Sequence, residues 1–463
     1  MTRFLAILKD SMRETIDGKV FLAMIVLSSL AILLAASLSF TPKPADTGLS
    51  AMTDEFEKIP LASFDRSYAI QYEISDFKQL NDARKPWNGE YSFRLTARDA
   101  KKFPFKLLVM FTGMRGSRRN PEQSHQDREE IIKIVTEAQG KPQEEQEKYI
   151  EEKLLQKMQR VKAEQLEEYI FDQYTDRGNL EVTSVKSAPT PADEKGLYAF
   201  DIKAKGKANT YNRWPHDVGI FFGAWDLYTE PVGVAVFDIE KWAVGYVGGA
   251  IFLLISSVMT AFFIPNMLRK GTVDLLLSKP IHRWSLLLLK YFGGLLFMFL
   301  NTVVLIGGFW LVMGLRSGIW GWTFLLMIPI LTFQFAIYYA VSTLAGVLSR
   351  NTIVAILAAC FTWAFLFVLG WMFTLSKPVP GRESSKFHKT VKVIHKITPR
   401  IGDLDSLSTY VIRADLLQED NFQKEQSRKA VEDISWPESI SVSLIFIALL
   451  LGAACAWFST REY

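Results

Sequence analysis

The sequence contains little cysteine and none of the common catalytic motifs. Only two cysteines, Cys360 and Cys455, occur among its 463 residues, and both lie in apolar segments, so no disulfide framework holds the exposed parts together. The absence of HExxH, CxxC and GxSxG motifs argues against zinc proteases, dithiol redox proteins and serine hydrolases. Of the five histidines, His388 and His395 share a basic segment, where solvated side chains are more common than metal ligands. We therefore expect no catalytic residue, no metal site and no cofactor.

A phosphate-binding loop is missing as well. The Gly-Lys pairs that begin at Gly18, Gly140 and Gly206 are followed by Val, Pro and Ala, so none completes the GxxxxGK[ST] motif that cradles nucleotide phosphates. We therefore expect that this chain does not hydrolyse ATP itself. Basic clusters interleaved with aromatic residues, the usual pattern of a nucleic-acid interface, are also lacking.

Charged residues make up 22% of the chain but avoid several long apolar segments. Each segment is long enough to cross about 30 Å of hydrocarbon as a helix, and too continuous to be the alternating strand of a barrel. None contains an acidic residue, which disfavours an ion-coupled transporter, because such proteins need buried ionisable groups. We therefore predict an α-helical membrane protein with six transmembrane helices. The six apolar segments are residues 20–40, 242–264, 285–313, 320–348, 351–375 and 439–458.

Lysine and arginine predict the orientation of these helices. They occur before the first helix, between the second and third, between the fourth and fifth, and after the sixth, whereas the loop between the third and fourth has only Arg316. By the positive-inside rule, both termini are therefore cytoplasmic. The 377–438 loop is basic yet lies outside by parity; this is a mild conflict, since long loops count weakly in the rule. Seven tryptophans near the predicted helix ends are typical of a membrane interface: Trp242, Trp284, Trp320, Trp322, Trp371, Trp436 and Trp457.

Residues 41–241 form a large insert after the first helix, and parity places it outside the cell membrane. Its β-branched and aromatic residues predict strands at 66–77, 91–97, 180–186 and 197–204. Apolar residues recur at helical spacing within the charged segment 121–172, which predicts one or two long exposed helices. We expect an α+β domain in which these helices are a solvated face rather than a dedicated partner site.

Two cytoplasmic segments are candidates for contact with the membrane surface or a partner. Residues 3–17 place apolar side chains on one helical face and charged ones on the others, as in a helix that lies in the membrane interface. In the 265–284 loop, Thr272 can cap a short helix and Pro280 ends it, because proline removes a backbone donor. The residues alone favour an ordinary interfacial connector for this loop.

The loop sequence GTVDLLLSKPIHRW, followed by SLLLLKY at 285–291, resembles permeases of ATP-binding-cassette (ABC) transporters of the type-2 exporter family. The N-terminal amphipathic helix, the six apolar segments and the ITPRIGDLDSL stretch at 397–407 fit the same family. The resemblance implies that the loop is a coupling helix that docks into a separate ATPase. Relatives often have acidic residues before the Gly-Thr pair, whereas residues 266–270 here read NMLRK. The residues implied in ATPase coupling are Gly271, Thr272, Leu275, Leu276, Leu277, Pro280, Ile281 and Arg283.

The function implied by this resemblance is that of an exporter permease in the cell (inner or plasma) membrane. Its expected partners are an ABC ATP-binding subunit, a second permease copy or a homologous permease, and the lipid bilayer, with no nucleic acid. The alternative is a membrane-anchored sensor or assembly factor whose insert binds a partner without transport. The expected organisation runs from an interfacial helix (1–19), helix one (20–40) and the insert (41–241) to helices two to five (242–376), an outer loop (377–438), and helix six with a short cytoplasmic tail (439–463).

Overall fold

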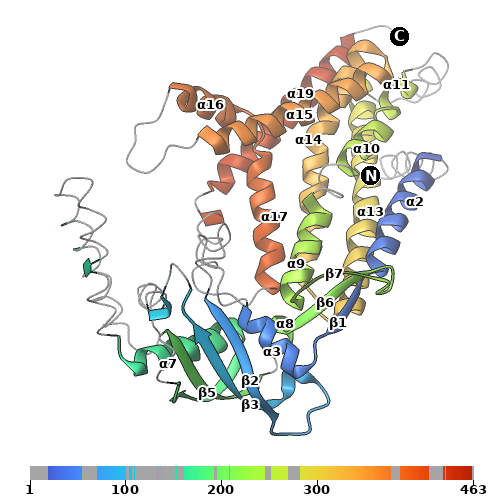
Figure 1. Cartoon of the computed structure of the whole chain (residues 1–463). Coiled ribbons are helices and arrows are strands. Elements are labelled where there is room, and N and C mark those ends of the chain that lie inside the picture. The colour runs from blue at the N-terminus through green and yellow to red at the C-terminus, as the bar shows by residue number, and fades with distance from the viewer. Residues whose placement is uncertain are drawn as a thin grey trace. The chain divides into compact units, whose positions relative to one another are not determined.

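A computed structural model describes most of the chain (Figure 1). The described part is predominantly helical. The described residues are 19–54, 70–100, 104–106, 109, 133, 137, 152–153, 161–191, 196–207, 209–245, 252–268, 282–376, 386–416, 431–432 and 434–460. The predicted interfacial helix at 3–17 and most of the predicted helical region at 121–172 lie outside these residues.

The chain divides into two compact units. We call Met1–Ser39, Ile220–Trp225 and Ala235–Tyr463 the membrane unit, and Phe40–Gly219 with Asp226–Val234 the insert unit. The insert unit lies almost entirely within the predicted 41–241 insert, but it ends at Val234 and leaves out Ile220–Trp225. Each unit has its own packing.

A four-stranded antiparallel sheet forms the centre of the insert unit. Its strand order is β2-β3-β5-β4, and β3 pairs with β5 from Glu90↔Lys205 to Arg98↔Leu197 without interruption. The register of β2 on β3 shifts between Ser75 and Lys78, where Asp76 has a left-handed backbone (φ 52°). The strands are β2 (Gln71–Gln79), β3 (Glu90–Arg98), β4 (Leu180–Ala188) and β5 (Leu197–Gly206). The strands predicted at 91–97, 180–186 and 197–204 are therefore present.

One face of this sheet is buried because apolar and polar residues alternate along its strands. In β3 the side chains of Tyr91, Phe93, Leu95 and Ala97 are all buried, and the residues between them are partly exposed. Phe105 lies over this face and contacts the rings of several neighbours in edge-on or tilted geometry, namely Tyr72, Tyr169, Tyr198 and Phe200. The insert thus has a continuous aromatic core of its own.

Short elements complete this part of the chain. A three-stranded sheet has the order β1-β6-β7, and Trp214 next to it is fully buried, with its indole N–H donated to the Lys43 carbonyl at 2.9 Å. Helix α7 packs against β4. The elements are β1 (Ser39–Pro42), α3 (Ala45–Asp54), η3 (Pro86–Asn88), α7 (Ala163–Asp172), the π-helical turn η4 (Gln173–Arg177), α8 (Thr210–Arg213), β6 (Pro215–Ile220) and β7 (Trp225–Pro231).

Among the described residues, four helices of the membrane unit are long and apolar enough to cross a bilayer: Arg283–Ser317, Trp322–Ser349, Thr352–Phe373 and Trp436–Thr460. They correspond to the last four predicted transmembrane helices. Two shorter apolar helices, Leu22–Ala36 and Leu253–Met267, fall on the first two. The helices of this region are α2 (Lys19–Ala36), α9 (Val232–Trp242), α10 (Leu253–Thr260), α11 (Phe263–Met267), α13 (Arg283–Ser317), η6 (Trp322–Leu326), α14 (Met327–Ser349), α15 (Thr352–Ser376), α16 (Lys386–Ile397), α17 (Ile401–Leu416) and α19 (Trp436–Thr460).

The first two predicted helices differ from the structure for local reasons. Helix α2 ends at Ala36 rather than at residue 40, because Ser37 turns back to donate its hydroxyl to the Leu34 carbonyl at 2.7 Å and β1 follows. The 242–264 segment contains α10 and α11, separated at 261–262. Pro265 has no amide hydrogen to donate to the carbonyl four residues earlier, so a continuous helix loses a bond there.

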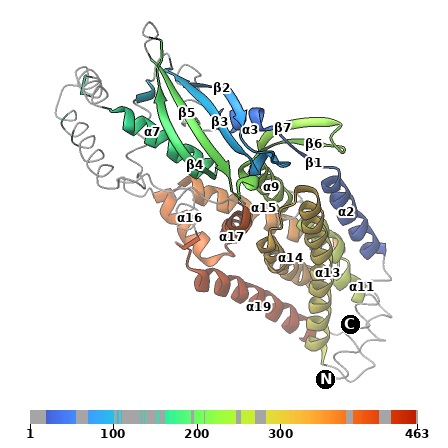
Figure 2. The same cartoon turned by 90° about the horizontal axis from the view of Figure 1, so that it is seen from below.

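Helix α14 lies at the centre of the membrane unit and packs against α10, α11, α13, α15, α17 and α19. Figure 2 shows it between α13 on one side and α17 on the other. Helices α13 and α14 approach closely at Gly294, where a Cβ atom would lie 2.5 Å from the Tyr339 hydroxyl. Tyr339 in turn stacks on Tyr291, whose hydroxyl donates to the Ala336 carbonyl at 2.9 Å. The missing side chain at Gly294 therefore makes room for a tyrosine ring between the helices.

Candidate functional site

The structure covers little of the predicted coupling loop itself. Of the residues implied in coupling, Arg283 begins α13. The remaining ones lie outside the described residues: Gly271, Thr272, Leu275, Leu276, Leu277, Pro280 and Ile281. The site must therefore be built from the helix ends on either side of residues 269–281.

These helix ends meet in one hydrophobic cluster, which we call the loop-anchor cluster. Its members come from the end of α11, the start of α13, the last turn of α14 and the last turns of α19. All are buried, and four are fully enclosed: Leu287, Val347, Ala454 and Phe458. The cluster comprises Ile264, Met267, Leu268, Leu286, Leu287, Val347, Ala454 and Phe458. Both ends of the loop are thus fixed to the same group of four helices.

Backbone contacts hold the two loop ends in place beside this cluster. The amide of Leu268 donates to the carbonyls of Ile264 and Pro265 at 3.2 and 3.1 Å, which closes the last turn before the loop. After the loop, the amide of Leu286 donates to the His282 carbonyl at 3.2 Å, which closes the first turn of α13. The Cys455 thiol lies 3.8 Å from the Trp284 carbonyl, a weak bond that ties α19 to the start of α13. The loop therefore leaves and re-enters formed helical turns.

Close helix contacts extend this arrangement to α14. Gly346 lies against Pro265 and Ile264 of α11, where an added Cβ atom would sit 3.4 Å from the proline ring. Because protein interiors are close-packed, a displacement of α11 is resisted by the side chains around it and carried to its neighbours. The end of α11, before the loop, is therefore in direct contact with α14.

A second group of polar contacts lies in the segment before the last helix. Gln334 of α14 donates its amide to the Asp405 carboxylate of α17 at 3.3 Å, and the Thr323 hydroxyl donates to the Val411 carbonyl at 2.6 Å. Helix α17 therefore runs beside α14, and polar side chains form hydrogen bonds between them and with the adjoining η6. The sequence pattern did not predict helices α16 and α17 in the 377–438 loop.

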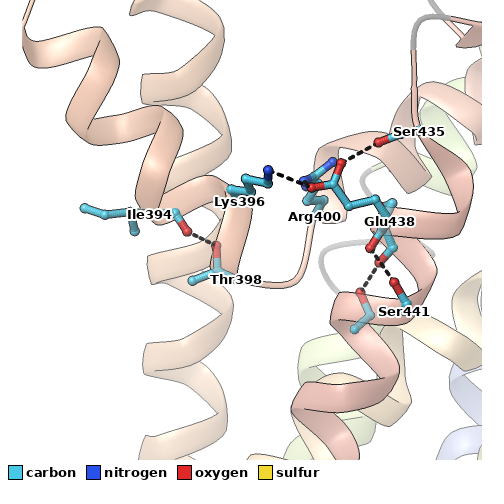
Figure 3. Close-up of polar contacts among 9 residues, drawn as sticks. Ile394, Lys396, Thr398, Arg400, Ser435, Glu438 and Ser441 are labelled. Atoms are coloured by element: carbon cyan, nitrogen blue, oxygen red, sulfur yellow. Dashed lines mark hydrogen bonds and ion pairs between the residues drawn. The ribbon is translucent and has the colours of Figure 1, made fainter.

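An ion cluster joins the turn between α16 and α17 to the first turn of α19 (Figure 3). The Glu438 carboxylate accepts from Arg400 at 3.0 Å and lies 3.5 Å from the Lys396 ammonium. The Ser435 hydroxyl donates to the same carboxylate at 2.8 Å. Arg400 belongs to the ITPRIGDLDSL stretch, which sequence reasoning noted only through its family resemblance. Two features of the sequence could have pointed to this contact. Arg400 follows Pro399, and Glu438 lies at the start of an apolar segment.

Polar side chains inside the four long helices are mostly satisfied locally. The Thr302 hydroxyl and the Asn301 amide donate to carbonyls four residues earlier, at 2.9 and 3.0 Å. Three buried hydroxyls on α14 have no hydrogen-bond partner among the described residues: those of Tyr339, Ser342 and Thr343. Within that described part, no group of His, Cys, Asp and Glu side chains is arranged to hold a metal ion.

Comparison with known proteins agrees with this arrangement. Residues 5–463 match the family described as ABC-2 family transporter protein. Comparison with curated proteins gives no match. A permease of this family is a membrane subunit that performs no catalysis and works with an ATP-binding subunit in a lipid bilayer. Because the match extends over nearly the whole sequence, the chain belongs to the ABC-2 family of transporter proteins.

Proposed function

We propose that this chain is the permease of an ABC exporter and that a separate ATP-binding subunit drives it through the 265–284 loop. In this proposal Leu275, Leu276 and Leu277 form the apolar face of the coupling helix, while Thr272 and Pro280 bound it. Gly271, Ile281 and Arg283 complete the contact surface. ATP binding closes the ATPases, and the closure pushes on this helix.

The loop-anchor cluster is the observation that carries the proposal. A helix that receives force from another subunit needs rigid connections at both ends, since a loose connection would absorb the displacement. Met267 and Leu268 on one side, and Leu286 and Leu287 on the other, are buried in the same cluster. Val347 and Phe458 bring α14 and α19 into it. A push on the loop would therefore tilt four helices together.

The proposed topology has six transmembrane helices, with both termini in the cytoplasm of a cell whose plasma or inner membrane holds the protein. The insert (41–241) and the 377–438 loop lie outside. Two permease copies, or this chain and a related one, form the pathway between them. The transport cycle then alternates between inward-open and outward-open arrangements, and the ATPase shifts the balance because it binds them with different affinities.

Replacement of Leu276 and Leu277 by aspartate tests the docking step. The full-length chain is purified with the ATP-binding subunit that associates with the wild-type protein. Two charges in an apolar contact should weaken this association by at least about tenfold, the effect expected of central interface residues. Leu80→Asp is the matched control, because this exposed leucine of the insert unit gains the same charge away from the cytoplasmic loop.

The outcomes separate the two candidate functions. Loss of the ATPase in the double variant but not in Leu80→Asp supports the permease. Unchanged association and unchanged ATP hydrolysis in the double variant would contradict the coupling helix. A wild-type chain that purifies without any ATPase would favour a membrane-anchored sensor or assembly factor.

Phe458→Ala tests the transmission step separately. Phe458 is fully buried in the loop-anchor cluster, so its loss loosens the contact between α19 and the loop ends without changing the docking surface. The ATPase should remain bound, whereas ATP hydrolysis by the complex in nanodiscs should fall between about twofold and thirtyfold. Phe361→Ala is the control, because Phe361 is exposed on α15. Equal hydrolysis in the two variants would show that the cluster does not transmit the movement.

A further inference from the structure

Helix α16 (Lys386–Ile397) presents three different surfaces around its axis. The sequence KFHKTVKVIHKI places both histidines and Val391 on one side, Lys389, Lys392 and Lys396 on a second, and Val393 and Ile397 on a third. The first side packs against α15, and the exposed residues of α16 lie on the other two sides.

The packed side fixes α16 to the end of α15. His388 and Val391 are buried, and the His388 ring lies 3.0 Å from the Ser376 hydroxyl through Nδ1. The Phe373 ring stacks on His395 with a centroid distance of 4.1 Å and on His388 at 5.9 Å. These contacts hold α16 where α15 leaves its membrane-spanning segment, Thr352–Phe373.

The second side is a row of lysines. Lys389, Lys392 and Lys396 follow one another at helical spacing of three and four residues, and all three are exposed. Lys396 forms the ion pair with Glu438. Lys389 and Lys392 make no ion pair with any residue that the structure describes, so their charges face outward from the helix.

The third side is apolar and open. Phe387, Val393 and Ile397 are 54%, 62% and 69% exposed. Val393 and Ile397 lie about 40° apart around the helix axis, next to the lysine row, and Phe387 lies farther round the helix. The neighbouring helix continues this character, because Phe367 and Trp371 near the end of α15 are more than half exposed as well. In a membrane-spanning helix such residues face lipid, and an exposed tryptophan close to its end is typical of the headgroup level.

We propose that α16 lies in the membrane interface and binds anionic phospholipid. Its apolar edge inserts among the acyl chains beside α15, and Lys389 and Lys392 pair with phosphate headgroups. A basic row beside an apolar edge is complementary to a negatively charged lipid surface and not to an acidic protein, which offers no acyl layer. The proposal concerns the lipid surroundings of the permease and is independent of how the ATPase couples.

This assignment also resolves the basic character of the 377–438 loop, which conflicts mildly with its position outside. Lysines that bind lipid headgroups at the end of α15 do not indicate, by the positive-inside rule, which side of the membrane is cytoplasmic. They serve as an attachment of the α16–α17 segment, which reaches α19 through the Glu438 ion cluster.

A fluorescent reporter on the apolar edge tests insertion. Cys360→Ser and Cys455→Ser remove both native cysteines, and Val393→Cys then carries an environment-sensitive dye on the full-length chain. In nanodiscs of phosphatidylcholine mixed with phosphatidylglycerol, the dye should shift to the blue and resist quenching by iodide, more than in phosphatidylcholine alone. Ile397→Cys is a second reporter on the same edge, and Leu80→Cys in the insert unit should stay accessible in both.

The lysines are tested by lipid titration. Short-chain phosphatidylglycerol is added to the labelled protein in detergent, and the concentration that gives half of the spectral shift is measured. In Lys389→Gln/Lys392→Gln this concentration should rise by roughly twentyfold, since each lysine near an anionic surface contributes about fivefold. Lys186→Gln/Lys203→Gln removes the same charge from exposed positions of the insert unit and should leave it unchanged.

Three results would overturn the proposal. The first is a dye at Val393→Cys and Ile397→Cys that is fully quenched in both kinds of nanodisc. The second is an unchanged phosphatidylglycerol titration in Lys389→Gln/Lys392→Gln. The third is a shift caused equally by inorganic phosphate or present without added lipid, because the edge would then bind free anions or be covered by protein.

Discussion

The insert unit and the membrane unit differ in the kinds of side chain that they leave exposed. In β3 of the insert, the buried residues Tyr91, Phe93 and Leu95 alternate with polar ones that face solvent. In the membrane unit, many of the largest apolar side chains are exposed, and small polar ones such as Ser342 and Thr343 are buried. In the insert unit, water drives apolar side chains into the core. In the membrane unit, lipid is as apolar as leucine, so no such effect drives the helices together.

The hydrophobicity of a residue therefore indicates whether its side chain is buried only in a domain that is surrounded by water. Helices α14 and α15 show this within one unit, since both are strongly apolar. More than half of the most apolar part of α14 is buried, at 56%, against 22% for that of α15. Close packing between the helices depends instead on small residues, as at Gly294.

The largest expected effect is on stability, and it compares one phenylalanine of the insert core with one on the surface of a membrane helix. Phe93→Ala, at a position that is 2% exposed in the insert core, should reduce the free energy of unfolding by about 3–5 kcal/mol. Phe361→Ala, at a position that is 73% exposed on α15, should change stability by less than about 0.5 kcal/mol. Limited proteolysis of the full-length chain in nanodiscs against denaturant concentration measures both. Similar losses in the two variants would show that Phe361 is covered by protein in the assembled transporter.

A smaller effect is expected where the membrane helices touch. A valine at Gly294 would collide with the Tyr339 ring, so Gly294→Val should cost about 1–3 kcal/mol and separate α13 from α14. At Gly307 on the same helix an added Cβ atom meets nothing within 4 Å, and Gly307→Val is therefore the matched control. Cross-linking between cysteines introduced into α13 and α14 measures the separation. Equal cross-linking in both variants would contradict the close approach at Gly294.

The smallest effect is a pH dependence that only the insert should show. Burial lowers the pKa of His216 from its usual value near 6.5, although the Trp214 carbonyl at 2.8 Å and the charge of Asp217 act in the opposite direction. The folded state therefore favours neutral His216, while the unfolded chain takes up a proton as the pH falls below about 6.5. The stability of the insert should decrease there by at most about 1.4 kcal/mol per pH unit.

Proteolysis of the insert at several pH values between about 7.5 and 5.5 measures this dependence. His216→Asn keeps a donor near the Trp214 carbonyl but does not titrate. The stability of the insert in this variant should therefore not change over this pH range. The four long helices should keep their protease resistance throughout. If the variant retained the full slope, another group would be responsible for it.

The β-branched and aromatic content of its strands made the insert sheet predictable. The segments 91–97, 180–186 and 197–204 gave β3, β4 and β5 within about two residues of their ends. The last four membrane helices were equally clear from their apolar length. The family match over residues 5–463 confirms the resemblance that the GTVDLLLSKPIHRW loop first indicated.

Contacts between distant segments could not be predicted from periodicity. Arg400 and Glu438 meet only because α17 folds back along α14, and no local pattern encodes that path. The loop-anchor cluster has the same origin, since Leu287, Val347 and Phe458 come from three helices whose apolar residues all look alike in sequence. The early end of α2 and the break between α10 and α11 depend on single turns, at Ser37 and Pro265. The roles of the loop residues and the six-helix count remain predictions.

The length of α13 has a consequence for where the coupling loop is held. At 1.5 Å per residue, its 35 residues extend about 52 Å, whereas a bilayer with its headgroups is only about 40–45 Å thick. The stretch between Lys290 and Arg316 is about 39 Å long, close to the thickness of a bilayer with its headgroups. The first two turns of α13, from Arg283, would then stand clear of the lipid. Under the proposed function, these two turns would carry the connection to the 265–284 loop beyond the membrane surface.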